Sequence, residues 1–294
     1  MQIASVLCPV DFSEHSDRAL AVGLGLASAF GAHVTVLAVN DALLDAAARA
    51  AGRSDVLARQ TQDELRALLQ RHQALDGSPW TVPAVSVQVG DPAEVIVATA
   101  GDYKSDVIVM GTEGLGGPKK FLLGSTTERV LRMAASPVLA VPAGPSRVRH
   151  GAEGIELRIG RVLVAVDVEH PLGESVAAAG MLARRFRVPV QMLAVVPESG
   201  ARGAWKDTAA AAADERRTRA KAALDALVPR LGEGVEVDVE VRAGRPADQI
   251  TQAAAERGCG LIVMGSGTRH RPGTTAYRVL CQADVPVLAV PAAG

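Results

Sequence analysis

Residues 6–39 read "VLCPVDFSEHSDRALAVGLGLASAFGAHVTVLAV", and this stretch decides the fold. An apolar run ends at Asp11, a segment with helical spacing of apolar residues follows, and a second apolar run ends at Val39. Near-continuous runs of Val, Leu, Ile and Ala are typical of strands that are buried on both faces of a sheet. Strand, helix and strand in this order predict a right-handed crossover between two parallel strands.

The same stretch returns in the second half of the chain. Residues 162–195 read "VLVAVDVEHPLGESVAAAGMLARRFRVPVQMLAV", which aligns Asp11 with Asp167 and Val39 with Val195, both at an offset of 156. Further matches keep the same order: "VQVGDPAEVI" with "EVRAGRPADQI", "SDVIVMGT" with "CGLIVMGS", and "SPVLAVP" with "VPVLAVP". Similarity in this order indicates a tandem duplication.

Each half predicts the same alternation of strands and helices. With 294 residues, the chain is long enough for two domains with separate cores, which we expect at 1–145 and 157–294. The polar segment 143–156, broken by Gly and Pro, is read as a linker. In the first half we expect strands at 3–10, 33–39, 82–89, 106–110 and 137–141, and helices at 14–30, within 42–75, from Pro92 to about Gly101, and from Ser125. The fold class is therefore α/β, with two tandem doubly wound five-stranded parallel sheets.

Composition limits the kind of protein. Hydrophobic residues make up 48% of the chain and aromatic residues only 3%, so the core is expected to be aliphatic. The net charge of −1 gives no overall field for nucleic acid or an anionic membrane. Cys8, Cys259 and Cys281 show no metal or redox spacing. Without a signal peptide or a membrane span in the sequence, we expect a reduced, cytoplasmic protein.

A glycine-rich stretch follows the fourth predicted strand. Residues 109–131 read "VMGTEGLGGPKKFLLGSTTERVL". The spacing fits neither the Walker A loop, GxxxxGK[ST], nor the Rossmann fingerprint, GxGxxG, both of which usually follow the first strand of their folds. What stands here is Gly111-x2-Gly114-x9-Gly124-Ser125-Thr126.

This spacing suits a phosphate loop. Gly111 and Gly114 have no Cβ, so backbone N–H groups can approach an anion closely. The helix expected from Ser125 turns the positive end of its dipole and its unpaired N–H groups toward that anion. Lys119 and Lys120 add charge, although two solvated lysines are an equally good interpretation. Taken alone, the glycines are also explained as turn formers and Ser-Thr as a helix cap.

The motif resembles that of the universal stress protein family, whose ATP-binding members carry G-x2-G-x9-G-[ST] after the fourth strand. "PVDFSE" at residues 9–14, "GDP" at 90–92 and the final "SPVLAVP" also match the family. The resemblance covers nearly the whole chain, as two copies. It implies a Rossmann-like fold of the adenine nucleotide α-hydrolase type.

The resemblance also implies an ATP site, with Mg²⁺ as a companion of the triphosphate. In the family, the acid after the first strand lies near the adenosine and the backbone at the end of the second strand reads the adenine edge. Carried over residue by residue, the implied site comprises Pro9, Val10, Asp11, Val39, Met110, Gly111, Gly114, Gly124, Ser125 and Thr126. No catalytic residues and no metal ligands are assigned.

The second copy departs from the motif. Thr268 stands where the first copy has Gly114. Gly273 follows Gly265 by 8 positions, whereas 13 separate Gly111 from Gly124, so 5 loop residues are missing. This shorter loop cannot wrap a triphosphate in the same way. We interpret the basic residues Arg269, His270 and Arg271 as a solvated loop tip, in preference to a site for a smaller anion.

The resemblance implies a cytoplasmic regulator or protector under stress that binds ATP in its first domain. Two other functions stay open: a slow ATPase or self-phosphorylating enzyme, and an interaction module without nucleotide.

The last strand of each half is expected at a sheet edge, which invites pairing. We predict that 137–141 pairs with 286–290 as an internal pseudo-dimer, and a homodimer through the same edges is the alternative. The family is similar in forming dimers through this strand.

Overall fold

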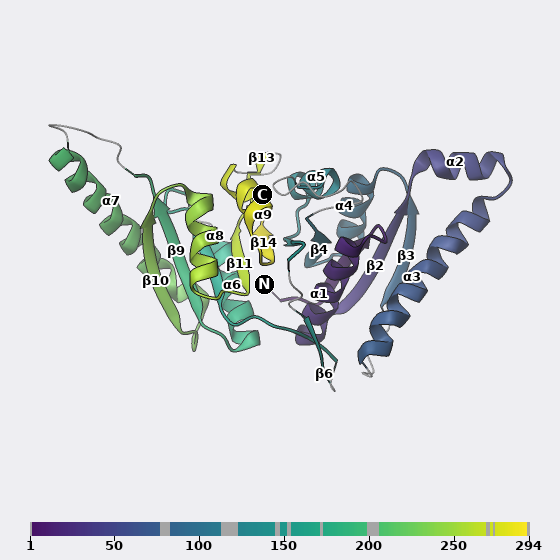
Figure 1. Ribbon diagram of the computed structural model, residues 1–294, viewed down its shortest axis with the longest axis horizontal. Helices are drawn as coiled ribbons and strands as arrows, with labels where there is room; N and C mark the ends of the chain where they lie inside the picture. The colour runs from purple at the N-terminus through teal and green to yellow at the C-terminus, as the bar shows by residue number, and fades with distance from the viewer. Residues whose placement is uncertain are drawn as a thin grey trace. The chain divides into compact units, whose positions relative to one another are not determined.

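The computed structural model describes residues 2–76, 83–112, 123–144, 148–151, 154–170, 173–198, 206–268, 271–272 and 274–292. Its contacts divide the chain into two compact units, the first mainly the residues up to Arg158 and the second mainly the residues from Ile159 on. Strands alternate with helices in both units, as Figure 1 traces from purple to yellow. The predicted α/β class and the tandem repeat are confirmed.

The first unit is a parallel sheet in the order β3-β2-β1-β4-β5. These strands are β1 (Ser5–Val10), β2 (His33–Asn40), β3 (Ala84–Val89), β4 (Val107–Gly111) and β5 (Val138–Val141). Its helices are α1 (Glu14–Phe30), α2 (Ala42–Ala50), α3 (Ser54–Asp76), α4 (Pro92–Asp102) and α5 (Ser125–Met133). β1 and β4 are almost wholly buried, as expected of strands covered on both faces.

Right-handed crossovers decide which helices share a face of this sheet. α1 and α3 lie on one face, where His72 of α3 reaches Asp17 of α1 at 2.8 Å. α4 and α5 lie on the other, where Arg129 of α5 reaches Asp91 at 2.6 Å. Asp91 is the N-cap of α4, and Pro92 is its first residue, as predicted.

The long helix expected within 42–75 is α3, and the structure adds a shorter helix, α2, before it. α2 ends at Ala50, and α3 begins at Ser54. Between them Gly52 adopts φ +66°, a left-handed conformation that glycine adopts at no steric cost and that terminates helices. The sequence pattern of apolar residues runs through this break and hides it.

The segment read as a linker has structure of its own. β6 (Val148–Gly151) and β7 (Gly154–Leu157) form an antiparallel hairpin that packs on α1. Ile155 is buried in this contact. Gly25 of α1 permits the close approach, since a Cβ there would come within 3.2 Å of Ile155 Cγ2. Part of the expected linker therefore belongs to the first unit.

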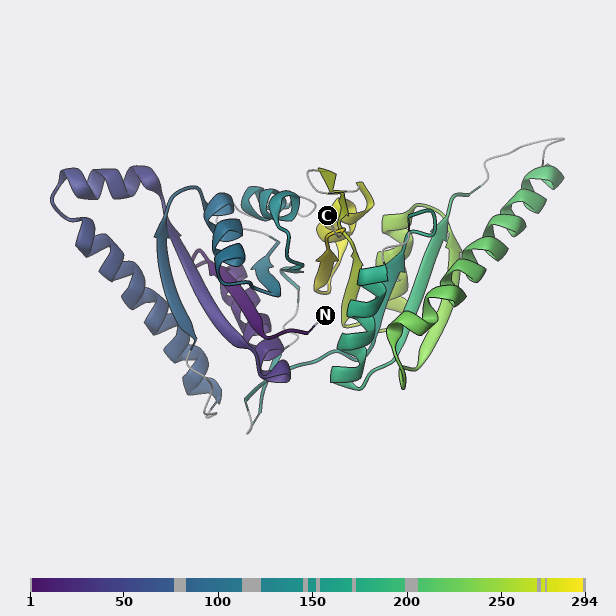
Figure 2. The same ribbon diagram turned by 180° about the vertical axis from the view of Figure 1, so that it is seen from behind.

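The second unit repeats the topology, with the order β10-β9-β8-β11-β14. Its strands are β8 (Val162–Val166), β9 (Val190–Val196), β10 (Val237–Ala243), β11 (Leu261–Gly265) and β14 (Val287–Val290). Its helices are α6 (Gly173–Phe186), α7 (Lys206–Leu227), α8 (Pro246–Glu256) and α9 (Thr274–Gln282). In Figures 1 and 2, α7 runs beside β9 and β10.

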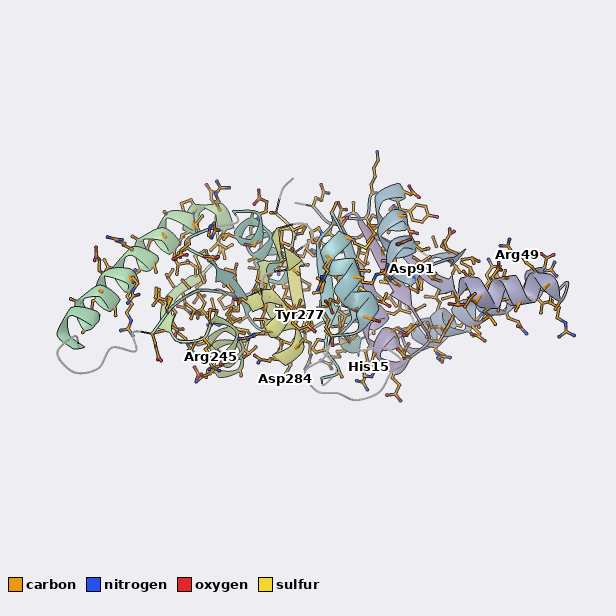
Figure 3. The ribbon with its side chains drawn as sticks, turned by 90° about the horizontal axis from the view of Figure 1, so that it is seen from above. His15, Arg49, Asp91, Arg245, Tyr277 and Asp284 are labelled. Atoms are coloured by element: carbon orange, nitrogen blue, oxygen red, sulfur yellow. The ribbon has the colours of Figure 1, made fainter. Side chains whose placement is uncertain are left out.

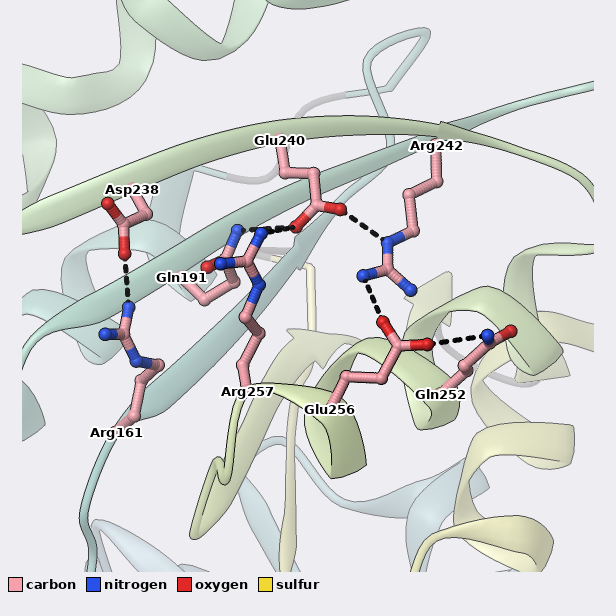
Figure 4. Close-up of polar contacts among 8 residues, drawn as sticks. All are labelled: Arg161, Gln191, Asp238, Glu240, Arg242, Gln252, Glu256 and Arg257. Carbon is pink, nitrogen blue, oxygen red and sulfur yellow. Dashed lines mark hydrogen bonds and ion pairs between the residues drawn. The ribbon is translucent and has the colours of Figure 1, made fainter.

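A network of charged side chains covers the outer strand of the second unit (Figure 4). Glu240 of β10 accepts hydrogen bonds from Gln191 at 3.2 Å, Arg242 at 2.7 Å and Arg257 at 3.1 Å. Arg242 also reaches Glu256 at the end of α8 at 2.7 Å. Paired charges on an edge strand discourage further strand pairing there.

Candidate functional site

The strand order of the first unit reverses between β1 and β4. In open α/β sheets, ligands bind at such a switch point, at the carboxyl ends of the strands. The β1–β4 ladder consists of Val6 with Val107 and Leu7 with Ile108, and it ends before Pro9. Pro9 has no N–H to contribute to a longer ladder. The two strands therefore part where the predicted site residues begin.

The second unit shows what a longer ladder looks like. Ala165 occupies the place of Pro9 at the repeat offset of 156. It pairs with Met264, so β8 and β11 stay paired two positions further than β1 and β4. The proline in β1 is thus a local reason for the opening at the switch point of the first unit.

Asp11 is held in a fixed turn directly after β1. Its Oδ1 accepts hydrogen bonds from the Ser13 backbone N–H at 3.1 Å and from the Ser13 hydroxyl at 2.5 Å. Ser13 is in turn the N-cap of α1 and accepts from the Ser16 N–H at 3.2 Å. The Asp11 carboxylate is exposed at the carboxyl edge of the sheet, with its position set by the start of α1.

Phe12, between these two residues, has an unusual backbone. Its φ is +62°, a left-handed conformation that is costly for a bulky residue, and its side chain is 41% exposed. Strained residues held in place by their surroundings cluster at functional sites. An exposed aromatic residue therefore directly follows Asp11 in this turn.

β2 ends at the same edge of the sheet, next to β1. Val39 is half-buried and lies in register with Gln88 of β3. Asn40 follows, and its Oδ1 accepts from the Thr61 hydroxyl at 3.0 Å. The Asn40 Nδ2 is buried and has no hydrogen-bond partner among the described residues. An unpaired buried donor beside Val39 is a candidate contact for a ligand.

The end of β4 and the start of α5 are clamped together. The Gly124 N–H donates to the Thr112 carbonyl at 2.7 Å, and the Thr127 hydroxyl donates to the Gly111 carbonyl at 2.7 Å. Thr112 is fixed by its own N–H, which donates to Val141 of β5 at 3.0 Å. The chain thus leaves β4 and returns to the same point at the carboxyl edge.

The N-terminus of α5 has no side-chain cap. Its N-cap is Gly124, and no side chain accepts from its first N–H groups, unlike α1, α2 and α4, which Ser13, Asp41 and Asp91 cap. Those N–H groups and the helix dipole favour an anion. Ser125 is exposed beside them.

Arg129, one turn further along α5, orients this helix through an ion pair to Asp91, the residue at the start of α4 in Figure 3. That contact, together with the hydrogen bond from the Glu94 N–H, holds the pKa of the Asp91 carboxyl below its usual range.

The structure therefore brings the described part of the predicted site to one edge of one sheet. Gly114, Lys119 and Lys120 lie outside the described residues. Sequence reasoning missed Ser13, Asn40, Thr112 and Thr127, which hold or adjoin the predicted residues. Ser13 had a local signal, since a serine two residues after an aspartate favours a side-chain-stabilised turn. Thr127 had none, because its partner Gly111 is 16 positions away.

The second unit carries a cavity of about 1000 Å³ at the equivalent place. The cavity is lined by Asp167, Val195, Met264 and Gly265, which are the counterparts of Asp11, Val39, Met110 and Gly111.

No helix within the described ranges is long and apolar enough to cross a bilayer. Nor do three His, Cys, Asp or Glu side chains of these ranges gather into a possible metal site.

Comparisons with known proteins assign both units to the same family. The sequence profile of the universal stress protein family matches residues 3–142 and again 158–291. A universal stress protein of Thermus aquaticus is 35% identical over 138 residues, 47% of this chain and 97% of the relative. One from Methanocaldococcus jannaschii is 32% identical over 137 residues, 46% of this chain and 80% of the relative.

Among solved structures, a universal stress protein of Archaeoglobus fulgidus matches with a TM-score of 0.68 at 22% identity. The match covers 99% of this chain and 97% of that one, so the tandem fold is shared over the full length. The chain belongs to the universal stress protein family, with two copies of the family domain in tandem.

Proposed function

We propose that the chain is a nucleotide-binding regulator that holds ATP in its first unit. The observation that carries this proposal is the clamp of Gly124 and Thr127 onto the end of β4. It places the uncapped N-terminus of α5 at the switch point between β1 and β4, where a phosphate chain is best stabilised.

Each part of the site has a chemical role in this proposal. The N–H groups of α5 and the hydroxyls of Ser125 and Thr126 bind phosphate oxygens. Asp11 accepts hydrogen bonds from the ribose, with Ser13 fixing its position. The backbone of Val39 reads the adenine edge. Mg²⁺ accompanies the triphosphate, whose oxygens supply most of its ligands.

The remaining contacts in the proposed site are apolar or come from the loop. Pro9, Val10 and Met110 supply the apolar surface under the base and the sugar, and Val10 and Met110 are buried. Gly111 begins the loop that approaches the phosphates. Gly114 is assigned to the same loop from the spacing of the sequence motif. ATP binding then signals nucleotide state to a partner in the cytoplasm under stress.

Calorimetric titration of the full chain tests the proposal. We expect one ATP per chain, because the second copy lacks the long loop. Gly124→Glu places a negative carboxylate where the phosphates lie and should abolish binding. Gly101→Glu is the matched control, since a Cβ at Gly101 meets nothing within 4 Å at the far end of α4. Two equal ATP sites, or full binding by Gly124→Glu, would contradict the proposal.

The same titrations should include cAMP and dAMP. Two universal stress proteins that match 49% and 44% of this chain were solved with these ligands, at TM-scores of 0.35 and 0.33. Phosphate released from labelled ATP separates a binding protein from a slow ATPase. Nucleotide recovered from the heat-treated purified chain separates both from an interaction module without nucleotide.

A further inference from the structure

The cavity of the second unit has a composition of its own. It lies at the carboxyl ends of β8, β9 and β11 and is closed on one side by α7. Apolar side chains form most of its wall, among them Val168, Val196 and Ile250. All of its lining residues belong to the second unit. The space can therefore be argued from this unit alone.

Small side chains of α7 form part of the cavity wall. This helix joins β9 to β10 and packs on both strands. Ala220 and Ala223 of its inner face line the cavity, whereas Leu224 is fully buried and does not. Truncated side chains in a core leave space that the surroundings fill only partly.

Cationic side chains from α7 line the cavity as well. Arg219 is paired with Glu215 on the same helix. Arg216 donates from Nε to the Ala212 carbonyl at 3.2 Å. Its terminal nitrogens have no ion-pair partner within the part of the chain that is described. Arg216 is therefore a cation that an anionic ligand can engage.

The Asp167 carboxylate, which lines this cavity, already has partners on the protein. Asp167 accepts a hydrogen bond from the Glu169 N–H at 3.0 Å, and its other oxygen lies 3.6 Å from His170 Nδ1. Glu169 and His170 also line the cavity, so both signs of charge are present around Arg216. A ligand with one anionic group suits this balance better than one with several, which Asp167 and Glu169 would repel.

The loop after β11 also argues against a triphosphate. Gly273 follows Gly265 by 8 positions, whereas 13 separate Gly111 from Gly124 in the first copy, so the loop is too short to wrap a triphosphate in the same way. We propose that the second unit binds a small organic anion, with an apolar body in the cavity and a single charged group at Arg216. This site is separate from the ATP site proposed for the first unit and does not depend on it.

Two fluorescent probes with the same apolar body test the proposal on the full chain. 8-Anilinonaphthalene-1-sulfonate carries one negative charge, and N-phenyl-1-naphthylamine carries none. Ala223→Leu puts a larger side chain into the cavity wall, so it should remove the second unit's share of binding for both probes. Ala222→Leu, on the exposed face of α7, is the control and should bind both as before.

The charge is tested separately. Arg216→Gln should weaken the sulfonate probe about fivefold and leave the uncharged probe unchanged, since a partly exposed ion pair contributes modestly. Arg217→Gln, the neighbouring arginine that does not line the cavity, is its control. Because Arg216 is exposed, this variant keeps the proposal testable even if Ala223→Leu does not fold.

Competition identifies the source of the anion. Displacement of the probe by 2-naphthoate, a singly charged aromatic carboxylate, supports the proposal. Displacement by AMP alone, whose phosphate is close to doubly charged at pH 7, assigns a mononucleotide instead and contradicts it. Binding of the sulfonate probe that neither Ala223→Leu nor Arg216→Gln reduces would overturn the proposal. So would displacement by ATP as effective as that by 2-naphthoate.

Discussion

The Thr127 hydroxyl donates a buried 2.7 Å hydrogen bond to the Gly111 carbonyl oxygen. Gly111 ends β4, and Thr127 lies in the first turn of α5. The bond joins the first glycine of the motif to the helix that follows its last glycine. Both ends of the loop are therefore fixed relative to the sheet before any ligand binds, which lowers the entropic cost of binding.

Removing this bond should weaken both the fold and the proposed ATP site. Thr127→Val keeps the shape of the side chain but leaves the buried Gly111 carbonyl unpaired, at a cost of about 1–3 kcal/mol. We expect roughly tenfold weaker ATP binding by calorimetry and a lower urea midpoint for the first unit. Thr127→Ser keeps the hydroxyl and should bind normally. Lower stability with unchanged ATP affinity would assign Thr127 to the fold alone.

Charge in the loop should favour ATP over adenosine. Lys119 and Lys120 lie outside the described residues, and their role is predicted from the sequence. Replacing both with alanine should weaken ATP binding by about 1 kcal/mol for each lysine that pairs with a phosphate, or several-fold in affinity, and leave adenosine binding nearly unchanged. Lys104→Ala, beyond the far end of α4, is the control. Equal weakening of both ligands would indicate a misfolded loop instead.

The contact between α1 and α3 should depend on acid. The hydrogen bond from buried His72, with the charges of Arg71 and Arg18, holds the pKa of Asp17 below its usual range. A carboxyl group whose pKa is lower in the folded state than in the unfolded state stabilises the fold. This contribution is fully present at pH values above the unfolded-state pKa of about 3.9. That contribution is lost as the pH falls through the folded pKa.

Asp17→Asn should therefore destabilise the first unit at pH 7, and the difference from the parent chain should shrink as the pH falls below about 3.9. The effect should stay below about 1 kcal/mol, because the Asp17 side chain is 45% exposed. Urea unfolding is followed by the fluorescence of Trp80 in a Trp205→Phe background, so that only the first half reports. Glu14→Gln, an exposed carboxylate on the same helix, is the control. A deficit in Asp17→Asn that does not shrink in acid would contradict the linkage.

Pairing of the two halves through their last strands stays a prediction from sequence. In its own unit, β5 pairs with β4 and β14 pairs with β11. Cysteines in place of Leu139 and Leu288 should form a disulfide within single chains, seen by non-reducing electrophoresis at low protein concentration. Exclusively inter-chain disulfides would favour a homodimer. Leu139→Pro, made in the chain without the added cysteines, should loosen the contact in either arrangement, because proline disrupts the strand.

The sequence by itself determined the class of fold and most of its elements. α1 begins and ends where predicted because both ends have local signals, the Ser13 cap and Gly31 at φ +66°. Buried strands are recognisable because their continuous apolar runs are needed on both faces of the sheet. The repeat and the glycine spacing pointed to the family, because both are properties of residue order.

Only the tertiary structure decided how those elements make a site. Two contacts join segments that are distant in sequence: the hydrogen bond between Thr127 and Gly111, and the packing of Ile155 on Gly25. The end of the β1–β4 ladder before Pro9 is set by the geometry of the sheet. The cavity beside Ala220 and Ala223 likewise depends on what α7 packs against, which no alanine-rich pattern reveals. Local order specifies helices and strands, whereas the space between them is set by contacts that form only when the chain is folded.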